Sequence, residues 1–547
     1  MSPDVSAVRD DFPILDQDVN GHPLTYLDNA ATTQTPRQVY DVFEEYYAGY
    51  NANVHRGIHE LSHRASVAYE AAHDRLAAFV GASGGREEMV FTRNTTESIN
   101  LVAHGLALPE FGPDDVIVTT EMEHHASLVT WQQVAERTGA ELRFVRVTDT
   151  GHLDVEHAKS LVDGDTELVA VPHVSNVLGT VNPVETFAEL AHDAGAVLLV
   201  DGAQSAPTRP VDVEAMGADF FTFSGHKMAG PTGIGGLYGR RDLLAEMGPF
   251  LYGGEMIQHV TFDRSTWNGL PWKFEAGTPP IAEAIALAAA VDYLDDLGMD
   301  WVREHEDRLA QYALDRLSER DDVVTYGPPA GEERTGLVSF NVDGVHGHDV
   351  SSLLDDRGIA VRAGDHCTQP LHDRLDIPGS VRASFYVYNT TDEIDRLLDA
   401  LVDAPAKVDD ALASDRYHDL VDEHHHEPRN SGGLAEPTLV KSSEETSCGD
   451  EGEFHVEIGD DGTIEALAFE SQSCAVSRAV ASLITEYLEG RTVADAADME
   501  GEVVRMLEGQ FPDLRRECVV GPEDVIREAA REYLDADADG TTPTRSA

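Results

Sequence analysis

Short apolar runs alternate with helical patterns from about residue 86 to residue 240, a pattern typical of a parallel sheet with crossover helices. Polar or reactive residues follow nearly every run. Because ligands bind beyond the carboxyl ends of the strands in such α/β sheets, we expect these residues to converge on one pocket. The predicted strands are "EMVFT" (88–92), "DVIVTT" (115–120), "LVAVPHV" (168–174), "AVLLVD" (196–201) and "DFFTFS" (219–224).

The rest of the pattern predicts how the chain is divided. A long helix is predicted within 277–298, and a smaller mixed α/β unit completes a first domain, 1–403. The polar, alanine-rich stretch 404–414 is predicted to be a linker. In the next unit, 415–535, alternating strand patterns precede an amphipathic helix that begins at Cys474. The last residues, 536–547, are expected to be disordered.

Composition narrows the possible partners. The formal net charge is −61, and the 100 acidic residues are distributed along the whole chain of 547 residues. This acidic, lysine-poor composition resembles that of proteins from halophilic cytoplasms. It argues against nucleic acid as a partner, because contacts with phosphates need a basic face. No stretch approaches the roughly 20 apolar residues of a membrane span, and the N-terminus has no apolar signal region. We therefore expect a cytoplasmic protein without membrane contact.

Lys227 is one of only five lysines, and it lies in the glycine-rich stretch "FFTFSGHKMAGPTGIGGLYG" (220–239). Unlike arginine, a lysine can lose its proton and attack a carbonyl, as in binding pyridoxal phosphate (PLP). Such a site also needs an anion for the pyridine nitrogen, a donor for the ring hydroxyl, an aromatic lid and a phosphate cradle. The candidates are Asp201, Gln204 and His124 for the first three, with Thr95, Thr96, Ser224 and His226 for the cradle.

Each of these residues, taken alone, has a simpler interpretation. Asp201, Thr95 and Thr96 could be helix caps, His124 a structural histidine, and Lys227 a solvated charge. Their order along the chain, each after a predicted strand, favours the PLP site.

Residues from about 10 to 403 resemble the SufS-type cysteine desulfurases almost without a break. The resemblance implies a homodimeric fold-type I PLP enzyme, with a large parallel-sheet domain and a small α/β domain, that converts L-cysteine to L-alanine. It is carried by "YLDNAATTQTP" (26–36), "NVHRGIHELSHRA" (53–65), "FTRNTTESIN" (91–100), "EMEHH" (121–125), "HVSNVLGTVNP" (173–183), "VDGAQSAP" (200–207), 223–239, "GGEMI" (253–257), "FEAGTP" (274–279), "RAGDHCTQPL" (362–371) and "RASFYVYNT" (382–390).

The resemblance also implies a role for each candidate. Lys227 would form the Schiff base, Asp201 would pair with the pyridine nitrogen, Gln204 would contact the ring oxygen and His124 would stack on the ring. Thr96, Ser224 and His226, with Thr95 beside them, would hold the phosphate, and Thr278 would reach in from the partner subunit. Asn176 and Arg382 would hold the substrate, because a bidentate arginine suits its carboxylate.

Cys367 lies between His366 and Thr368 in the predicted loop "RAGDHCTQPL". A lone cysteine there could be buried and inert, whereas in a desulfurase it is the nucleophile that takes sulfur as a persulfide. Two positions depart from the family: Asp365 stands where histidine is common, and Asn94 where glycine is common. An aspartate so close would raise the pKa of the thiol, which leaves the activation of Cys367 open.

Cys448, Asp450, Cys474 and Cys518 make a plausible tetrahedral zinc set, and the alternative is three unrelated thiols. Residues 415–535 resemble the α+β SufU/IscU group, which accepts sulfur from desulfurases. The resemblance makes these four residues ligands and Cys448 the sulfur acceptor, and it matches His348 to a desulfurase histidine that replaces a cysteine on zinc. It is carried by "HHHEPRNSGG" (424–433), "SCGDEGEF" (447–454), "FESQSCAVSRAVAS" (469–482) and "RRECVVGPEDVIREAA" (515–530).

The branch of this second family stays open. The spacing from Cys474 to Cys518 is like that of the IscU scaffolds, which build iron–sulfur clusters, but Glu517 stands where those scaffolds have histidine. We favour a zinc acceptor that passes sulfur to iron–sulfur assembly proteins. The alternatives are a cluster scaffold, a purely structural appended domain, or a selenocysteine lyase in the N-terminal part.

Overall fold

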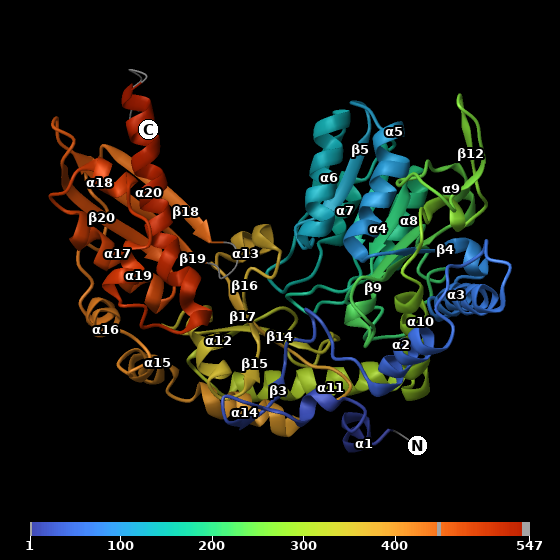
Figure 1. Cartoon of the computed structure of the whole chain (residues 1–547), viewed down its shortest axis with the longest axis horizontal. Helices are drawn as coiled ribbons and strands as arrows, with labels where there is room; N and C mark the ends of the chain where they lie inside the picture. Colours follow the sequence, from blue (N-terminus) through green and yellow to red (C-terminus); the bar gives the residue numbers. More distant parts are fainter. Residues whose placement is uncertain (1–2, 446–449, 539–547) are drawn as a thin grey trace.

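The computed structural model describes residues 3–445 and 450–538. It contains a large sheet, a smaller sheet and a C-terminal sheet, each covered by helices (Figure 1). Cys448, the predicted sulfur acceptor, lies outside the described residues.

The large sheet has seven strands in the order β4-β10-β9-β8-β7-β5-β6. All five predicted strands are present and, apart from β4 at the edge, they run parallel to one another. β10 is antiparallel to both β4 and β9. The strands are β4 (Met89–Thr92), β5 (Val116–Thr120), β6 (Glu141–Val145), β7 (Thr166–Pro172), β8 (Val197–Asp201), β9 (Phe220–Ser224) and β10 (Gly235–Gly239).

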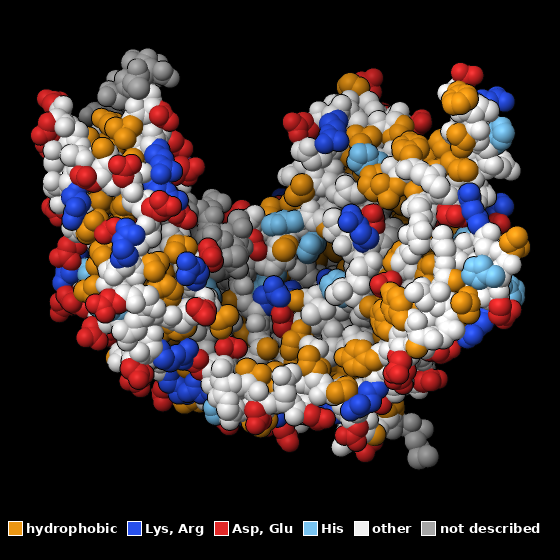
Figure 2. Space-filling view, viewed as in Figure 1, with side chains coloured by type: hydrophobic (Ala, Val, Ile, Leu, Met, Phe, Trp, Pro, Cys, Tyr) orange, Lys and Arg blue, Asp and Glu red, His pale blue; other side chains and the backbone are white. Residues whose placement is uncertain are grey.

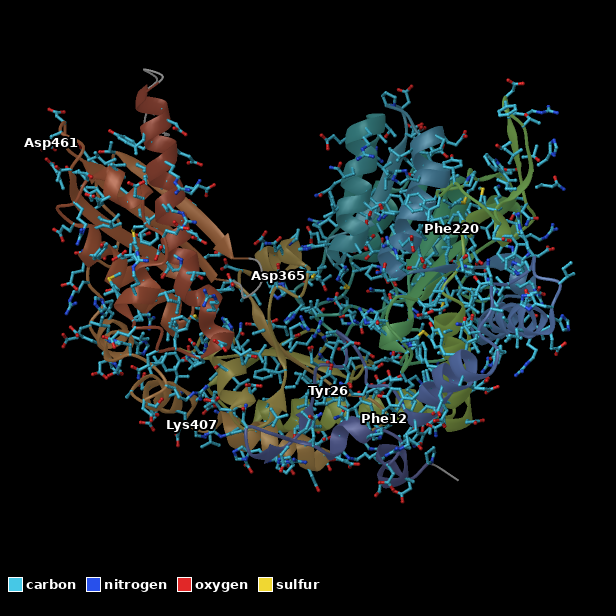
Figure 3. All side chains as sticks on the ribbon, viewed as in Figure 1. Phe12, Tyr26, Phe220, Asp365, Lys407 and Asp461 are labelled. Atoms are coloured by element: carbon cyan, nitrogen blue, oxygen red, sulfur yellow. The ribbon has the colours of Figure 1, made fainter. Side chains whose placement is uncertain are left out.

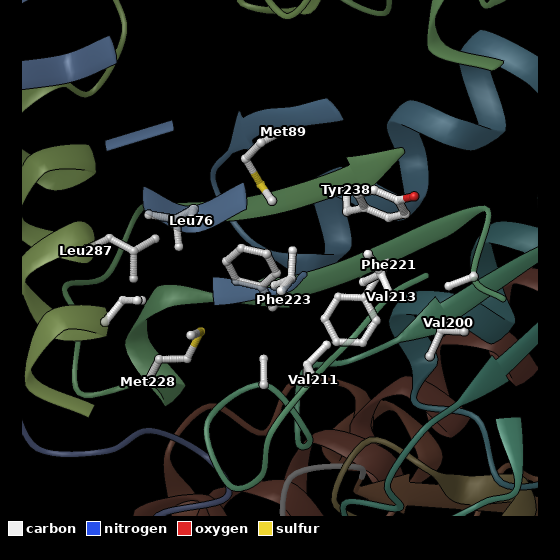
Figure 4. Packing of buried hydrophobic residues seen from close by; sticks show 14 of the residues in the cluster. Leu76, Met89, Val200, Val211, Val213, Phe221, Phe223, Met228, Tyr238 and Leu287 are labelled. Carbon is white, nitrogen blue, oxygen red and sulfur yellow. The ribbon is translucent and has the colours of Figure 1, made fainter. Parts of the chain in front are cut away.

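Helices cover both faces of this sheet, so its central strands are nearly continuous apolar runs. Phe221 and Phe223 of β9 point into the same buried cluster as Leu76 of α3 and Leu287 of α10 (Figure 4). The helices around the sheet are α2 (Arg37–Gly49), α3 (Glu60–Phe79), α4 (Thr95–Val102), α5 (Leu108–Glu110), α6 (His125–Thr138), α7 (Val155–Leu161), α8 (Val184–Ala194), α9 (Arg241–Glu246) and α10 (Ile281–Leu297).

The second sheet is antiparallel, in the order β13-β14-β17-β16; helices α11 and α12 pack on it, and α14 packs against both helices. A capping box of Thr390 and Glu393 starts α14. The strands are β13 (Val323–Tyr326), β14 (Leu337–Val342), β16 (Arg362–Gly364) and β17 (Ser380–Ser384). The helices are α11 (Met299–Ser318), α12 (Gly347–Asp355), α13 (Gln369–Leu375) and α14 (Thr391–Leu401).

Shorter elements complete the first part of the chain. β3 (Thr25–Tyr26) pairs in parallel with β15 (Ile359–Ala360) and so ties the N-terminal segment to the small sheet unit. The others are α1 (Val5–Arg9), the pair β1 (Asp18–Val19) and β2 (His22–Pro23), and the hairpin of β11 (Ile257–Val260) and β12 (Ser265–Trp267).

The C-terminal unit is a three-stranded antiparallel sheet, β18-β19-β20, packed against α17 and α20 around its own buried core. As predicted, α17 starts directly after Cys474. Its elements are α16 (Asp419–His426), β18 (Leu439–Glu445), β19 (Asp450–Ile458), β20 (Ile464–Gln472), α17 (Ala475–Leu488), α18 (Val493–Ala497), α19 (Glu502–Met506) and α20 (Arg516–Ala538).

The segment between the two parts is helical. α15 (Ala404–Leu412) spans most of the predicted linker, and its two ends are buried in different cores, Ala404 with the small sheet and Leu412 with the C-terminal unit. At the other end of the unit, α20 runs to Ala538, into the stretch predicted to be disordered. α15 therefore connects two cores instead of lying free in solvent.

The small sheet unit lies between the large sheet and the C-terminal unit (Figure 1). The surface is hollowed between these two outer parts, above the small sheet unit (Figure 2). Asp365, two residues before the predicted nucleophile, lies between these two outer parts (Figure 3). Among the described residues, no helix is both long and apolar enough to cross a membrane.

Candidate active site and metal-binding cluster

A pocket of about 440 Å³ lies at the carboxyl ends of the large sheet and is closed on one side by the small sheet unit. It brings together nearly all the predicted active-site residues, as the position of polar residues after strands led us to expect. Its walls include Asn94, Thr95, Thr96, His124, Asn176, Asp201, Gln204, Ser224, His226, Lys227, Asp365, Cys367 and Arg382. Thr278 is exposed and is not on the pocket wall, which leaves its predicted cross-subunit role untested.

Lys227 ends a single 3₁₀ turn, Gly225–Lys227, that follows β9 directly. Burial and the nearby charge of Arg382 lower its pKa to about 8, although the Asp201 carboxylate opposes this shift. Asp201 ends β8, and its Oδ1 accepts the Ala203 N–H at 2.8 Å. The amine is therefore close to the neutral form that can attack a carbonyl.

His124 is the N-cap of α6, and its Nδ1 accepts the backbone N–H of Ala126 at 3.0 Å. Burial, followed by the charge of Lys227, lowers the pKa of His124 to about 3. The ring is therefore neutral, and since Nδ1 is an acceptor, the proton sits on Nε2. The helix start thus fixes a neutral aromatic ring on the pocket wall, as a stacking role requires.

The N-terminus of α4 forms another wall. Asn94 caps the helix by accepting the Glu97 N–H at 3.0 Å in extended backbone, so a glycine is not needed at this position. Ser224 Oγ accepts the Thr95 N–H and donates to Thr95 Oγ1, both at 2.9 Å. Gly235 of β10 allows this strand to lie close to Asn94, because a Cβ at Gly235 would lie 2.8 Å from the Asn94 Cα. Hydroxyls at a helix N-terminus suit a phosphate.

Arg382 is buried, and its Nη1 donates to the Asn176 carbonyl at 2.9 Å. Its Nη2 lies 3.5 Å from Asp28, and its Nε has no partner among the described residues. Burial lowers the pKa of Arg382 to about 10, so it remains a cation at neutral pH. A buried cation with an unused donor beside the pocket suits a carboxylate ligand.

Arg362, on this wall, and its partner Asp28 were both missed in the sequence. Arg362 lines the pocket and donates through Nε and Nη2 to the two carboxylate oxygens of Asp28, at 3.2 and 2.9 Å. The same carboxylate holds Arg382. Both residues lie inside the motifs that carry the resemblance, but their pairing is visible only when β3 and the small sheet are brought together.

The pocket fits PLP. It joins a lysine of lowered pKa, a buried carboxylate, a neutral imidazole and a hydroxyl-lined helix start on one cavity. Gln204 Nε2 donates to the Ala30 carbonyl at 2.7 Å, which leaves its second N–H for the predicted contact with the ring oxygen. Cys367 is exposed on the same wall. Partial desolvation of its thiol, followed by the charge of Asp365, raises the pKa of that thiol.

A second cluster joins the two parts of the chain. The side-chain ligand atoms of His348, Cys474 and Cys518 all lie within 4.8 Å of one another. His348 Nδ1 is 3.5 Å from the Cys518 sulfur. His348 belongs to α12 of the small sheet unit, whereas Cys474 is the N-cap of α17 and Cys518 belongs to α20. Two cysteine sulfurs and an imidazole nitrogen are ligands that zinc prefers, so this donor set suits zinc.

Asp349, next to His348, strengthens the same junction. Its Oδ2 accepts the Ala475 N–H at the start of α17, and its Oδ1 accepts from Arg515 Nη2, both at 2.8 Å. The side chains of Asp349 and Arg515 are both about 95% buried. The small sheet unit therefore supplies both a candidate metal ligand and a helix cap to the C-terminal unit. The sequence did not point to this pair.

These features define a class of protein, an α/β enzyme with a lysine-based cofactor pocket, and comparisons agree. Residues 25–397 match the aminotransferase class-V family, and residues 416–539 match the NifU-like N-terminal domain. A cysteine desulfurase of Haloferax volcanii is 64% identical over 410 residues, which cover 73% of this chain and 96% of that protein. A probable cysteine desulfurase of Halobacterium salinarum is 63% identical over 402 residues, 73% of this chain and 96% of the other.

Solved structures show the same likeness. A cysteine desulfurase from Thermococcus onnurineus in its apo form has a TM-score of 0.70 at 43% identity, over 74% of this chain and 99% of that one. A cysteine desulfurase from Escherichia coli has a TM-score of 0.69 at 38% identity, over the same shares. The chain therefore belongs to the cysteine desulfurases of the class-V aminotransferase family, and it carries a NifU-like domain after the desulfurase part.

Proposed function

We propose that the protein is a PLP-dependent cysteine desulfurase that passes sulfur to its own C-terminal domain, which acts as a zinc-dependent acceptor for iron–sulfur assembly. The observation that carries the proposal is the cluster of His348 with Cys474 and Cys518, because it joins the enzyme to its appended domain through metal-binding side chains. We expect this chemistry in the cytoplasm.

In this proposal the pocket residues bind the cofactor and the substrate and move protons, while the cofactor supplies the electron sink. PLP, when bound, supplies the electron sink that weakens the bond between the Cβ and the sulfur of the substrate cysteine. Asp201 would hold the pyridine nitrogen, and the α4 N-terminus with Ser224 would hold the phosphate. Arg382 would bind the substrate carboxylate, and Lys227 would carry protons to and from the substrate carbon, as its pKa of about 8 suits.

Cys367 would receive the sulfur. Its sulfur forms a bond to the sulfur of L-cysteine, the carbon–sulfur bond breaks with its electron pair left on carbon, and protonation of that carbon gives alanine. The thiol proton of Cys367 leaves before the attack, since only the thiolate is nucleophilic. The outcome is a persulfide on Cys367, which is exposed on the pocket wall and accessible to an acceptor.

The acceptor is proposed to be Cys448. With His348 as a ligand beside Cys474 and Cys518, and with Asp450 as the expected fourth, zinc would need no further cysteine, which leaves Cys448 to attack the persulfide. Zinc held there keeps its cysteine ligands as thiolates. A tether raises the concentration of the acceptor near Cys367 to about the millimolar range, which limits loss of the persulfide to other thiols.

A homodimer is part of this proposal. Tyr252, Phe262 and Trp267, in and beside the β11–β12 hairpin, are exposed aromatic side chains on the part of the chain that carries Thr278. Exposed apolar surface of this kind suits a protein partner, here a second copy of the chain. Thr278 would then reach the phosphate of the neighbouring active site.

The test is alanine release from L-cysteine without added reductant, with the full chain loaded with PLP and zinc. Wild type is expected to exceed one turnover per Cys367, whereas Cys448→Ser should stop near one. The same stop is expected of wild type depleted of zinc. Equal turnover by Cys448→Ser would exclude the acceptor role, and sulfur accumulation that requires iron instead of zinc would support a cluster scaffold.

A further inference from the structure

The loop that carries Cys367 is backbone-strained. His366 and Cys367 have φ angles of 53° and 60°, so two consecutive residues with side chains occupy the left-handed region. Each such residue costs about 1–3 kcal/mol and persists only where its surroundings hold it in place. Something in the structure must therefore fix this turn, and its contacts identify what does so.

Asp365 makes three contacts that hold the turn. Its Oδ1 accepts the Cys367 N–H at 2.9 Å, and its backbone carbonyl accepts the Thr368 N–H at 2.9 Å and the Thr368 hydroxyl at 2.7 Å. Asp365 is itself buried. The aspartate therefore closes the turn on itself, as aspartates do in Asx turns.

The large sheet unit holds the other side of the same loop. The His125 N–H donates to the Cys367 carbonyl at 2.8 Å, and Asn176 Nδ2 donates to the His366 carbonyl at 2.9 Å. These contacts fix the two carbonyls, whereas among the described residues only Asp365 holds the amide of Cys367 itself. Removal of its acceptor would leave the left-handed Cys367 without its local support.

The charge of Asp365 has a second effect on Cys367. Burial raises the pKa of the thiol most, and Asp365 raises it further, while three nearby cations oppose the shift: Arg362, Lys227 and Arg382. The two nearest histidines add no positive charge, because burial lowers the pKa of His125 and of His366. The net result is a thiol that stays protonated to higher pH than an ordinary cysteine.

We propose that Asp365 is a positioning residue that holds Cys367 on the pocket wall through its backbone N–H, and that the negative charge of the same carboxylate lowers the reactivity of the Cys367 sulfur. The two effects come from one carboxylate but need different properties of it: the first needs an acceptor oxygen, the second needs the negative charge. This inference rests on the proposed role of Cys367 as the sulfur nucleophile.

Two substitutions separate these properties in the holoenzyme. Asp365→Asn keeps an acceptor oxygen and removes the charge, whereas Asp365→Ala removes both. Asp373→Asn, at an exposed aspartate of α13, is the matched control for loss of a nearby charge. The first measurement is the rate of iodoacetamide alkylation at Cys367 between pH 6 and 10, followed by mass spectrometry of its peptide so that the other cysteines do not interfere.

Both Asp365 variants should be alkylated about three- to tenfold faster than wild type at pH 7, because removing the negative charge that raises the pKa of the thiol favours the thiolate. Asp373→Asn should match wild type. The second measurement is single-turnover persulfide formation on Cys367. Asp365→Asn should form persulfide at least as fast as wild type, and Asp365→Ala at least tenfold more slowly.

Alkylation of Asp365→Asn at the wild-type rate across the whole pH range would overturn the electrostatic part of the inference. Equal persulfide formation by the Asn and Ala variants would overturn the positioning part. PLP absorbance and the melting temperature of each variant show whether it is folded. If wild type itself forms no persulfide on Cys367, the proposed function fails, while the alkylation comparison still tests the effect of the charge.

Discussion

The contact of Asp349 with the C-terminal unit gives a quantitative prediction about docking. Asp349→Ala removes the acceptor at the start of α17 and leaves Arg515 as a buried cation without its carboxylate. Breaking a buried pair by removing one partner costs about 3–5 kcal/mol. Since 1.4 kcal/mol is a factor of ten, the ratio of docked to undocked C-terminal unit should fall at least 100-fold.

This loss should separate two phases of alanine release. The first turnover needs only the PLP pocket and Cys367, so its amplitude should remain near one alanine per active site. A second turnover needs the sulfur to leave Cys367 for the acceptor, so the rate of the second turnover should fall at least tenfold in Asp349→Ala. Asp349→Asn keeps an oxygen for the Ala475 N–H but not the charge for Arg515, and it should lie between Asp349→Ala and wild type.

The assay is rapid-quench measurement of alanine with excess cysteine and no reductant, on zinc-loaded protein. Asp356→Ala is a suitable control, because Asp356 follows α12 and pairs with Arg416 at an accessible position. A smaller first turnover in Asp349→Ala would mean that the residue acts on the PLP pocket. An unchanged rate of the second turnover would refute the reasoning that this contact docks the proposed acceptor.

Three further predictions test the two sites. In PLP-free protein, the rate of PLP capture should rise with pH and level off above about pH 8, because burial lowers the pKa of Lys227 from 10.5 to about 8 and only the neutral amine attacks; a rise that continues to pH 10 would contradict this. After borohydride reduction, peptide mapping should find the pyridoxyl group on Lys227 and nowhere else. His348→Ala should speed zinc loss to a chelator at least tenfold, with exposed His22→Ala as the control, and equal loss from both would remove His348 from the ligand set.

Much of the active site was predictable because its residues follow strands whose pattern is strongly apolar. β6 was missed because "ELRFV" lies at the sheet edge and carries charges. β10 was missed because "GGLYG" has few side chains to show a pattern. A Cβ at Gly235 or Gly236 would collide with the Phe223 carbonyl or ring, so these glycines serve packing. Such a constraint comes from the neighbouring strand and cannot be seen in the local sequence.

The pairs between distant segments were out of reach for a similar reason. Asp349 and Arg515 are ordinary charges in an acidic sequence, and their burial depends on how two units dock. Arg362 and Asp28 meet only because β3 lies beside β15. α15 was predicted as a linker because it is polar overall, yet its two buried ends, Ala404 and Leu412, are what anchor it.

The small sheet unit explains how one chain can present both sites to each other. Cys367 lies just after β16, and His348 and Asp349 lie on α12, which packs directly on β16. Cys367, the proposed nucleophile, and the residues that contact the C-terminal unit therefore belong to the same small sheet unit. α15 connects the two units, whereas Asp349 of α12 contacts the C-terminal unit at the start of α17. Changes in the length of α15 should therefore alter sulfur transfer less than the single substitution Asp349→Ala.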